Sequence, residues 1–228
     1  MWIAQSTHRG ERMTKPTEET YREFQVAYDF LNHKLFNDQL PGCLITMQRR
    51  SRTYGFYCNR RFVNPSQGRE TDEIALNPSY FMARTVAGVL STLAHEMNHL
   101  RQYQFGKPGR RGYHNREWAD SMIAIGLHPS DTGEPDGRET GYHMTHYIVE
   151  AGPFDLACNE LLSTDFRLSW LEKPRELFTA GPPTGKVVSR TDGSNRWKYT
   201  CPKCLRNAWA KPDTALICGV CLLQMLHG

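Results

Sequence analysis

The stretch His95-Glu96-Met97-Asn98-His99 decides how the rest of this chain is interpreted. Residues four apart on an α-helix lie one turn apart on the same face, so the two imidazoles can converge on one metal ion while Glu96 stands beside them. Two histidines at this spacing with an adjacent carboxylate are typical of zinc sites that activate water for peptide hydrolysis. The pattern therefore makes His95 and His99 candidate zinc ligands and Glu96 a candidate catalytic residue.

A long helix is predicted around this stretch, from about Phe81 to Phe105. Each histidine lies two residues beyond a position of the apolar stripe, about 200° round the helix and therefore on another face. We expect the stripe to face the core and the imidazoles to be presented by a different side of the helix. The stripe consists of Val86, Leu90, Leu93, Met97 and Leu100.

A catalytic zinc ion needs a third protein ligand and one open position. After His99 the chain passes through a glycine-rich loop, residues 106–112, and reaches His114 at the start of another predicted helix, residues 115–125. The loop can fold the chain back toward the first helix, so His114 is the expected third ligand. His128, past the second helix, is a weaker candidate.

The elements before the motif are predicted to be one helix and three short strands. The helix should begin with Thr17 as its N-cap and end near Asn37 to Gly42. Its apolar face should carry Tyr21, Phe24, Tyr28, Leu31 and Leu35. Strand-like runs follow at Leu44 to Gln48, Thr53 to Cys58 and Glu73 to Leu76. They indicate a small, mostly antiparallel sheet, and the chain is therefore predicted to be an α+β protein.

The residues beyond the third histidine carry weaker patterns. The run from Tyr142 to Ile148 predicts a strand on which His143 and His146, three residues apart, point to opposite faces. Tyr142, His143 and His146 are candidates for stabilising an oxyanion or for holding a zinc ligand by a hydrogen bond. The apolar residues between 150 and 172 are expected to pack on the core, in a helix, without a function that the pattern reveals.

Length and composition fit one core domain with a small appendage. The 228 residues are 39% hydrophobic and 23% charged. No apolar run approaches the roughly 20 residues that span a bilayer, and the first 12 residues are too polar for a signal peptide. We therefore expect no membrane partner and a cytoplasmic location. The predicted organisation is a disordered leader (1–14), a catalytic domain (15–172), a Pro/Gly-rich linker (173–195) and a small module (196–228).

Four of the seven cysteines occur as two Cys-x-x-Cys pairs in that module, at Cys201, Cys204, Cys218 and Cys221. In a reducing compartment such pairs bind metal. Four thiolates fill every position of a tetrahedral zinc ion, so they predict a closed, structural site in a zinc ribbon. The ribbon is too small for a core of its own, and the metal should supply much of its folding free energy. Two zinc ions are thus expected, one catalytic and one structural.

Positive charge is concentrated in two parts of the chain. The net charge of +4 divides into +5 for residues 186–228 and −1 for the rest, and residues 49–69 contain six arginines, interleaved aromatic residues and no acid. Such a combination can follow a nucleic-acid backbone and stack on bases. A solvated surface or a charged sheet edge explains it equally well. The candidate nucleic-acid contacts are Arg49, Arg50, Arg52, Arg60, Arg61, Lys198, Lys203 and Arg206.

Several runs resemble the SprT-like zinc metalloprotease family, which includes bacterial SprT proteins and animal Spartan. These are Leu93 to His99, His114 before Glu117-Trp118, and Tyr142 to His146, with Phe30 to Pro41 and Ile74 to Pro78 upstream. The resemblance covers residues 20–150 and the C-terminal ribbon. It implies a zincin-like fold, zinc held by His95, His99 and His114, and catalysis by Glu96. It also implies that the substrates are proteins bound or crosslinked to DNA, which would place the protein on the nucleoid.

Two other functions stay open at this point. The first is a non-catalytic DNA-binding or regulatory protein, in which the ribbon reads DNA and the histidine site is either a relic or holds a structural zinc ion. The second is a peptidase that regulates one cytoplasmic protein and does not act on DNA. Peptidase activity separates the first function from a zinc endopeptidase. Salt-dependent DNA binding separates the second function from a peptidase that acts on DNA-bound proteins, because contacts to phosphates weaken steeply with salt.

Overall fold

The computed structural model describes residues 15–173, 197–210 and 214–227. The chain divides into two compact units, Met1–Thr179 and Ala180–Gly228, which are described separately. The predicted leader and, apart from Lys173, the predicted linker lie outside the described residues, so the predicted domain limits stay predictions. Within the described ranges, no helix combines the length and the apolar character needed to cross a bilayer.

The first unit begins with helix α1, Pro16–Phe36. Its N-cap is Lys15 and not Thr17 as predicted, because a proline suits the first helical position, where its missing N–H costs nothing. The helix ends at Asn37, as predicted. Tyr21, expected on the buried face, is 40% exposed. That face carries Thr20, Phe24, Tyr28 and Leu31.

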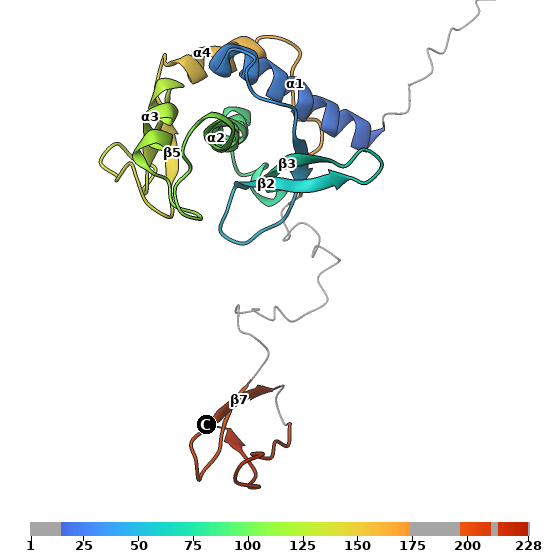
Figure 1. Cartoon of the computed structure of the whole chain (residues 1–228), viewed down its shortest axis with the longest axis vertical. Helices are drawn as coiled ribbons and strands as arrows, with labels where there is room; N and C mark the ends of the chain where they lie inside the picture. The colour runs from blue at the N-terminus through green and yellow to red at the C-terminus, as the bar shows by residue number, and fades with distance from the viewer. Residues whose placement is uncertain (1–14, 174–196, 211–213, 228) are drawn as a thin grey trace, which may run out of the picture. The chain divides into compact units, whose positions relative to one another are not determined.

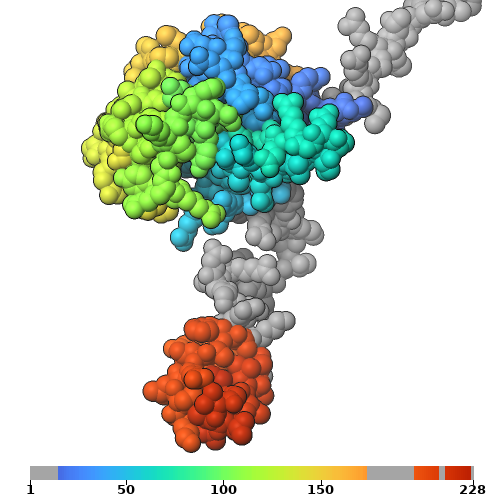
Figure 2. Space-filling model, viewed as in Figure 1, coloured from blue at the N-terminus to red at the C-terminus, as the bar shows by residue number. Residues whose placement is uncertain are grey.

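A three-stranded sheet follows, in the order β1-β3-β2. β2 and β3 form an antiparallel hairpin that projects at the edge of the unit (Figure 1; Figure 2). β1 pairs with β3 in parallel, so the expected mostly antiparallel sheet is in fact mixed. The sequence predicted only the apolar parts of the two hairpin strands, up to Cys58 in the first and from Glu73 in the second. The intervening residues 59–72 are largely polar, so their backbone pairing leaves no apolar pattern in the sequence. The strands are β1 (Leu44–Met47), β2 (Gly55–Asn64) and β3 (Arg69–Leu76).

Helix α2, Val86–Phe105, lies in the middle of this unit (Figure 1). It begins five residues later than predicted, because Thr85 caps it by accepting a hydrogen bond from the Gly88 N–H (3.1 Å), and a short 3-10 turn, Pro78–Tyr80, precedes it. α2 contacts α1, both strands of the hairpin and two later helices, α3 (Arg116–Ala124) and α4 (Pro153–Leu162). Every residue from 89 to 98 is therefore buried. The stripe residues Leu90, Leu93, Met97 and Leu100 lie in the core, as predicted, and the side of the helix that carries His95 and Glu96 is covered as well.

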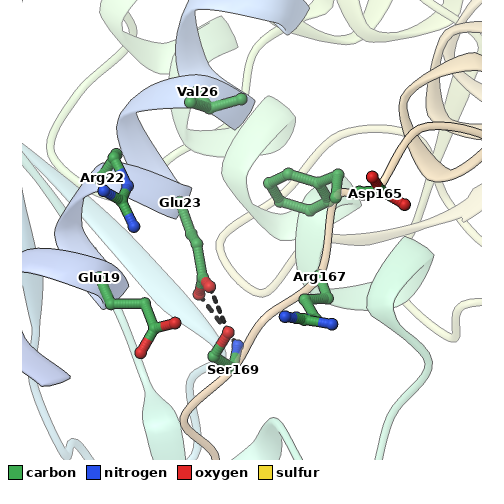
Figure 3. Close-up of a pocket in the computed structure, with 8 residues that line it drawn as sticks. Glu19, Arg22, Glu23, Val26, Asp165, Arg167 and Ser169 are labelled. Carbon is green, nitrogen blue, oxygen red and sulfur yellow. Dashed lines mark hydrogen bonds between the residues drawn. The ribbon is translucent and has the colours of Figure 1, made fainter. Parts of the chain in front are cut away.

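A second, two-stranded sheet carries the chain back toward α2. β4 (Leu127–Ser130) pairs antiparallel with β5 (Thr145–Ile148), which begins three residues later than predicted. The expected helix between 150 and 172 is α4, and the chain after it runs along α1. There Glu23 of α1 accepts hydrogen bonds from the N–H and Oγ of Ser169 (2.9 and 2.5 Å), beside a shallow groove (Figure 3). None of the histidines lines this groove.

The second unit is a small sheet with two turns that carry the cysteines. The strand order is β7-β6-β8, with both pairings antiparallel. Its core among the described residues is small and includes Tyr199, Met225 and the cysteines themselves. The strands are β6 (Trp197–Thr200), β7 (Asn207–Ala210) and β8 (Leu226–His227).

Candidate metal centre

Three imidazoles meet at the C-terminal half of α2. His95 and His99 lie one helical turn apart, and His114 comes from the residue two places before α3. One ring nitrogen from each lies within 4.8 Å of the others, and the Nε2 atoms of His99 and His114 are 3.1 Å apart. Two nitrogens on a tetrahedral zinc ion, each about 2.0–2.1 Å from it, lie about 3.3–3.4 Å apart. The donor set and its spacing therefore fit zinc.

His114 is oriented by its own backbone and side chain. It exchanges backbone hydrogen bonds with Gly141 (2.8 and 3.1 Å), and its Nδ1 donates to the same carbonyl oxygen (3.1 Å). Asn115 then caps α3 by accepting a hydrogen bond from the Trp118 N–H (3.0 Å). With Nδ1 engaged, Nε2 of His114 is left facing the other two histidines.

Trp118 forms the floor of the cluster and was missed as a site residue by the sequence analysis. Its indole is fully buried, and the ring centroids of His95, His99 and His114 lie 4.9, 5.2 and 4.3 Å from it. Among the described residues, its Nε1 has no hydrogen-bond partner. A sequence signal existed, because Trp118 lies four residues after the third histidine, in the first turn of the helix predicted to follow it.

Of the three further candidates, His146 joins the cluster. Its Nδ1 lies 3.2 Å from Nδ1 of His95, across 51 residues of sequence. His143 is exposed, and Tyr142 is 50% exposed at the end of the loop that holds Gly141. His128 stands apart from the cluster, stacked on Tyr147 with ring centroids 5.0 Å apart.

Burial keeps these imidazoles neutral at pH 7. It lowers the pKa of His95 well below its ordinary value, with smaller contributions from the neighbouring histidines. For the same principal reason the pKa of His99 falls to about 3, that of His146 to about 4, and that of His114 falls as well. A neutral imidazole offers a free lone pair, which is the form that binds metal.

Glu96 lies between α2 and the first residues of β2. It is only 5% exposed, and burial raises its pKa to about 8, against a smaller opposing effect of a hydrogen bond to the Tyr57 backbone. The strand approaches closely here: a Cβ on Gly55 would lie 3.3 Å from Glu96 Oε1 and 2.9 Å from both Thr92 Cγ2 and the Ala75 carbonyl oxygen. Only glycine fits this position without a shift of the strand.

Tyr57, also in β2, supports the cluster from the side of the sheet. Its ring stacks on His99 with the centroids 6.4 Å apart and the planes 17° from parallel. Its hydroxyl donates to the buried carboxylate of Asp72 (2.9 Å), which also accepts from Gln104 (3.0 Å) and from the backbone N–H of Arg60 (2.6 Å). This network fixes β2 against α2.

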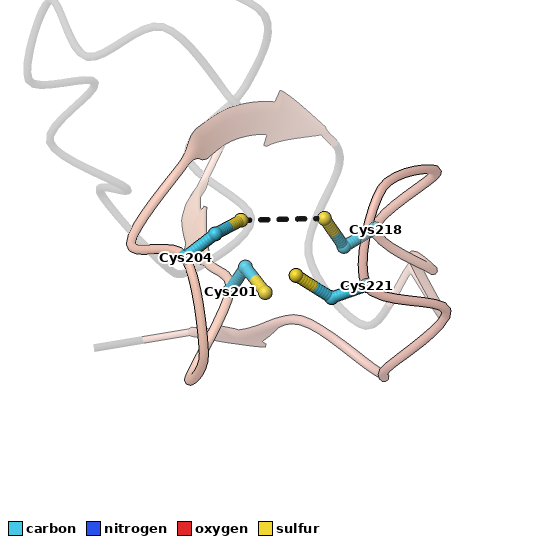
Figure 4. Close-up of side chains that lie close together, drawn as sticks. All are labelled: Cys201, Cys204, Cys218 and Cys221. Carbon is cyan, nitrogen blue, oxygen red and sulfur yellow. Dashed lines mark hydrogen bonds between the residues drawn. The ribbon is translucent and has the colours of Figure 1, made fainter.

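In the second unit the four cysteine sulfurs converge (Figure 4). All lie within 4.8 Å of one another, and Sγ of Cys204 and Cys218 are 3.6 Å apart. Thiolates on a tetrahedral zinc ion, with Zn–S of about 2.3 Å, lie about 3.8 Å apart. The backbone N–H of Cys204 is the main cause that lowers the pKa of the Cys201 thiol to about 6. The site fits a zinc ion with no open position.

The predicted nucleic-acid contacts are all exposed, and several have partners within the protein. Arg49 pairs with Glu172 (2.8 Å), Arg50 lies 5.1 Å over the ring of Phe56, and Arg60 lies 3.7 Å from a Glu70 oxygen. Arg52 and Arg61 are also exposed on the first unit, and the second unit contributes Lys198, Lys203 and Arg206. The described residues of the second unit contain no acid.

Comparisons with known proteins place these residues in context. The family model described as "SprT-like family" matches residues 24–138, which is half of the chain and includes the three histidines, Glu96 and Trp118. A protein of Salmonella typhimurium, described as an uncharacterised protein in the mucB 3′ region, is 51% identical over 74 residues. Those residues are 32% of this chain and the whole of that protein. No solved structure matches the chain.

Proposed function

The chain belongs to the SprT-like family, and from that premise we propose that it is a zinc-dependent endopeptidase with a zincin-like catalytic unit. The observation that carries the proposal is the convergence of three imidazole nitrogens within 4.8 Å, with the carboxylate of Glu96 on the same helix. The three histidines leave a fourth position of a tetrahedral ion open, as a catalytic site requires.

In this proposal His95, His99 and His114 hold the zinc ion. Zinc, when bound, polarises the scissile carbonyl and makes water more acidic. Glu96 takes the proton of the attacking water and passes it to the departing amine, which requires a carboxylate near the water and off the metal. The pKa of about 8 belongs to the metal-free protein, and a neighbouring cation lowers it toward the value of a base that is ionised at pH 7.

His146 is the proposed positioning residue for His95. The hydrogen bond between their Nδ1 atoms leaves Nε2 of His95 for the metal and sets the orientation of its ring. Tyr142, half-exposed and next to Gly141, which binds the backbone of His114, remains the candidate for contacting an oxyanion, and the exposed His143 is the weakest of the three. In the second unit, Cys201, Cys204, Cys218 and Cys221 are proposed to hold a structural zinc ion.

We further propose that the substrates are proteins bound or crosslinked to DNA. The support is the exposed arginine set on the first unit and the acid-free, basic surface among the described residues of the second. If these groups contact phosphates, DNA binding must weaken steeply between low and physiological salt. Exchanging Lys198, Lys203 and Arg206 for Gln should then reduce the slope of that dependence.

The experiment that tests this function incubates the zinc-loaded protein with a DNA-binding protein, with and without DNA. The proposal predicts cleavage that DNA accelerates and that the Glu96→Gln variant lacks. Cleavage that DNA does not affect would favour a peptidase with a partner unrelated to DNA. Binding to DNA without cleavage by the wild-type protein would favour a non-catalytic DNA-binding protein.

A further inference from the structure

Arg84 places a positive charge near the candidate catalytic residue, and the sequence patterns gave no reason to select it. It stands two residues before α2, and its Nη1 donates to Oγ1 of Thr92 (2.8 Å). Its guanidinium lies 4.2 Å over the ring of Tyr54, immediately before the first residue of β2. The side chain is therefore fixed between the N-terminal part of α2 and the edge strand of the sheet.

This guanidinium has no acidic partner in the part of the chain that the structure describes. Among the described residues, no carboxylate lies within ion-pair distance of Arg84, and the first turn of α2 carries no acid. Arg84 is half-buried, and burial lowers its pKa. Holding an unpaired charge partly out of water costs free energy, so the protein retains a charge that its own folding does not need.

Arg84 also lies close to the reaction centre. Thr92, which it contacts, is four residues before Glu96 and therefore on the same face of α2, about 6 Å away along the helix axis. Both residues border Gly55, because a Cβ there would touch Thr92 Cγ2 and Glu96 Oε1. The charge of Arg84 is also felt by His146, the neighbour of His95.

We propose that Arg84 is a substrate subsite that binds a carboxylate one to three residues away from the peptide bond that is cut. The inference rests on the proposed peptidase function. An extended peptide advances about 3.3 Å per residue, so the helical rise of about 6 Å from Glu96 to Thr92, together with the 2.8 Å hydrogen bond from Arg84 to Thr92, corresponds to about one to three residues. Nη1 donates to Thr92, one face of the guanidinium lies on Tyr54, and Nε and Nη2 lie 3.4 and 3.5 Å from the place that a Cβ of Gly88 would take. The guanidinium is therefore fixed, and its N–H groups that have no partner among the described residues can pair with a carboxylate. The carboxylate is an Asp or Glu side chain or the C-terminus of the substrate.

The test compares cleavage of random ten-residue peptides with amidated C-termini by the wild-type protein and three variants. The wild-type protein should cut peptides with Asp or Glu at one position within three residues of the cut at least tenfold more often than those with Asn or Gln there. Arg84→Gln should lose this preference, Arg84→Lys should keep only part of it, and Arg22→Gln, on exposed α1, should keep all of it. In a free-acid library, cuts near the C-terminus that disappear with Arg84→Gln would identify the terminal carboxylate as the ligand.

Other outcomes overturn the inference. A preference that Arg84→Gln leaves unchanged, or a wild-type protein that cuts without any acidic preference, contradicts the subsite. Loss of oligonucleotide binding in Arg84→Gln with unchanged peptide selectivity would assign Arg84 to phosphates instead. Zinc content and thermal unfolding of Arg84→Gln should stay close to those of the wild type, because the loss of the hydrogen bond to Thr92 and of the contact with Tyr54 is offset by removal of an unpaired charge held partly out of water. If neither the wild type nor any variant cuts a peptide, the proposed function itself fails, which is distinguishable from failure of the subsite alone.

Discussion

Replacing Trp118 by Phe should leave the protein nearly as stable as the wild type, although the indole is fully buried. Two effects oppose one another. The Nε1–H has no partner among the described residues, and a buried, unsatisfied donor costs about 1–3 kcal/mol, which the Phe variant recovers. Shrinking the ring leaves a space of about 40 Å³, which costs about 1 kcal/mol at about 24 cal/mol per Å³. We expect a change in unfolding free energy of less than about 1–2 kcal/mol.

Replacing Trp118 by Ala should have a different and larger effect. It removes the whole floor under His95, His99 and His114 and should cost about 3–5 kcal/mol of unfolding free energy. Zinc affinity of the histidine site should fall about 10–100-fold, as it does when groups that orient metal ligands are lost. The Phe variant keeps an aromatic floor and should keep most of that affinity.

Urea unfolding of the metal-free proteins and zinc titration against a competing chelator measure these two quantities. Trp170→Phe is the matched control, because Trp170 is 47% exposed and its Nε1 donates to Glu19 at the surface (2.7 Å). Equal destabilisation by Phe and Ala at position 118 would refute the reasoning, since it would mean that the N–H contributes to stability. Unchanged zinc affinity in the Ala variant would show that the indole does not hold the ligands.

Three further predictions concern pH, the sheet and the ribbon. In the metal-free protein, the buried histidines make stability fall as pH drops below about 6.5, because the unfolded chain then binds protons that the native imidazoles do not bind. Glu96 has the opposite effect: its contribution to stability is lost as pH rises from about 4.5 to 8, because the native carboxyl keeps its proton to a higher pH than the unfolded chain does. Urea unfolding should therefore find Glu96→Gln more stable relative to wild type at pH 8 than at pH 5, and the opposite order would contradict the burial of Glu96. Gly55→Ala should cost about 1–3 kcal/mol by the same assay, because its Cβ would lie 2.9 Å from a backbone oxygen, whereas Gly42→Ala, with nothing within 4 Å, should change stability by less than about 1 kcal/mol. Cys204→Ser should reduce bound zinc from two ions to one by elemental analysis and unfold the ribbon while peptide cleavage persists; loss of both ions would contradict two independent sites.

Local spacing predicted the helices and the clustering of the metal-ligand candidates. The i, i+4 histidines, the third histidine after a glycine-rich loop and the paired Cys-x-x-Cys runs each depend on residues close in sequence, and the structure brings each set together. The first residues of α1 and α2 were less predictable than their last residues. A proline at the first position of α1 and the capping threonine before α2 outweighed the apolar periodicity.

Contacts between distant segments were not predictable from these patterns. The approach of His146 to His95 and the position of Arg84 beside Thr92 follow from tertiary packing. The parallel pairing of β1 with β3 depends on which edge of the hairpin the first strand joins. The burial of residues 89–98 of α2 on all sides also depends on tertiary packing, since the sequence shows one clear apolar stripe while the surrounding helices and strands cover the other sides of this segment as well.

Hydrolysis in H₂¹⁸O tests the central claim most directly. The zinc-loaded wild-type protein and the Glu96→Gln variant, with equal zinc content, are incubated with the same protein substrate, and the products are examined by mass spectrometry. The proposed mechanism predicts one ¹⁸O atom in the new C-terminal carboxylate of each product made by the wild type, and no product from the variant or from the chelator-treated wild type. Cleavage that continues at an unchanged rate in the variant or without zinc would contradict it.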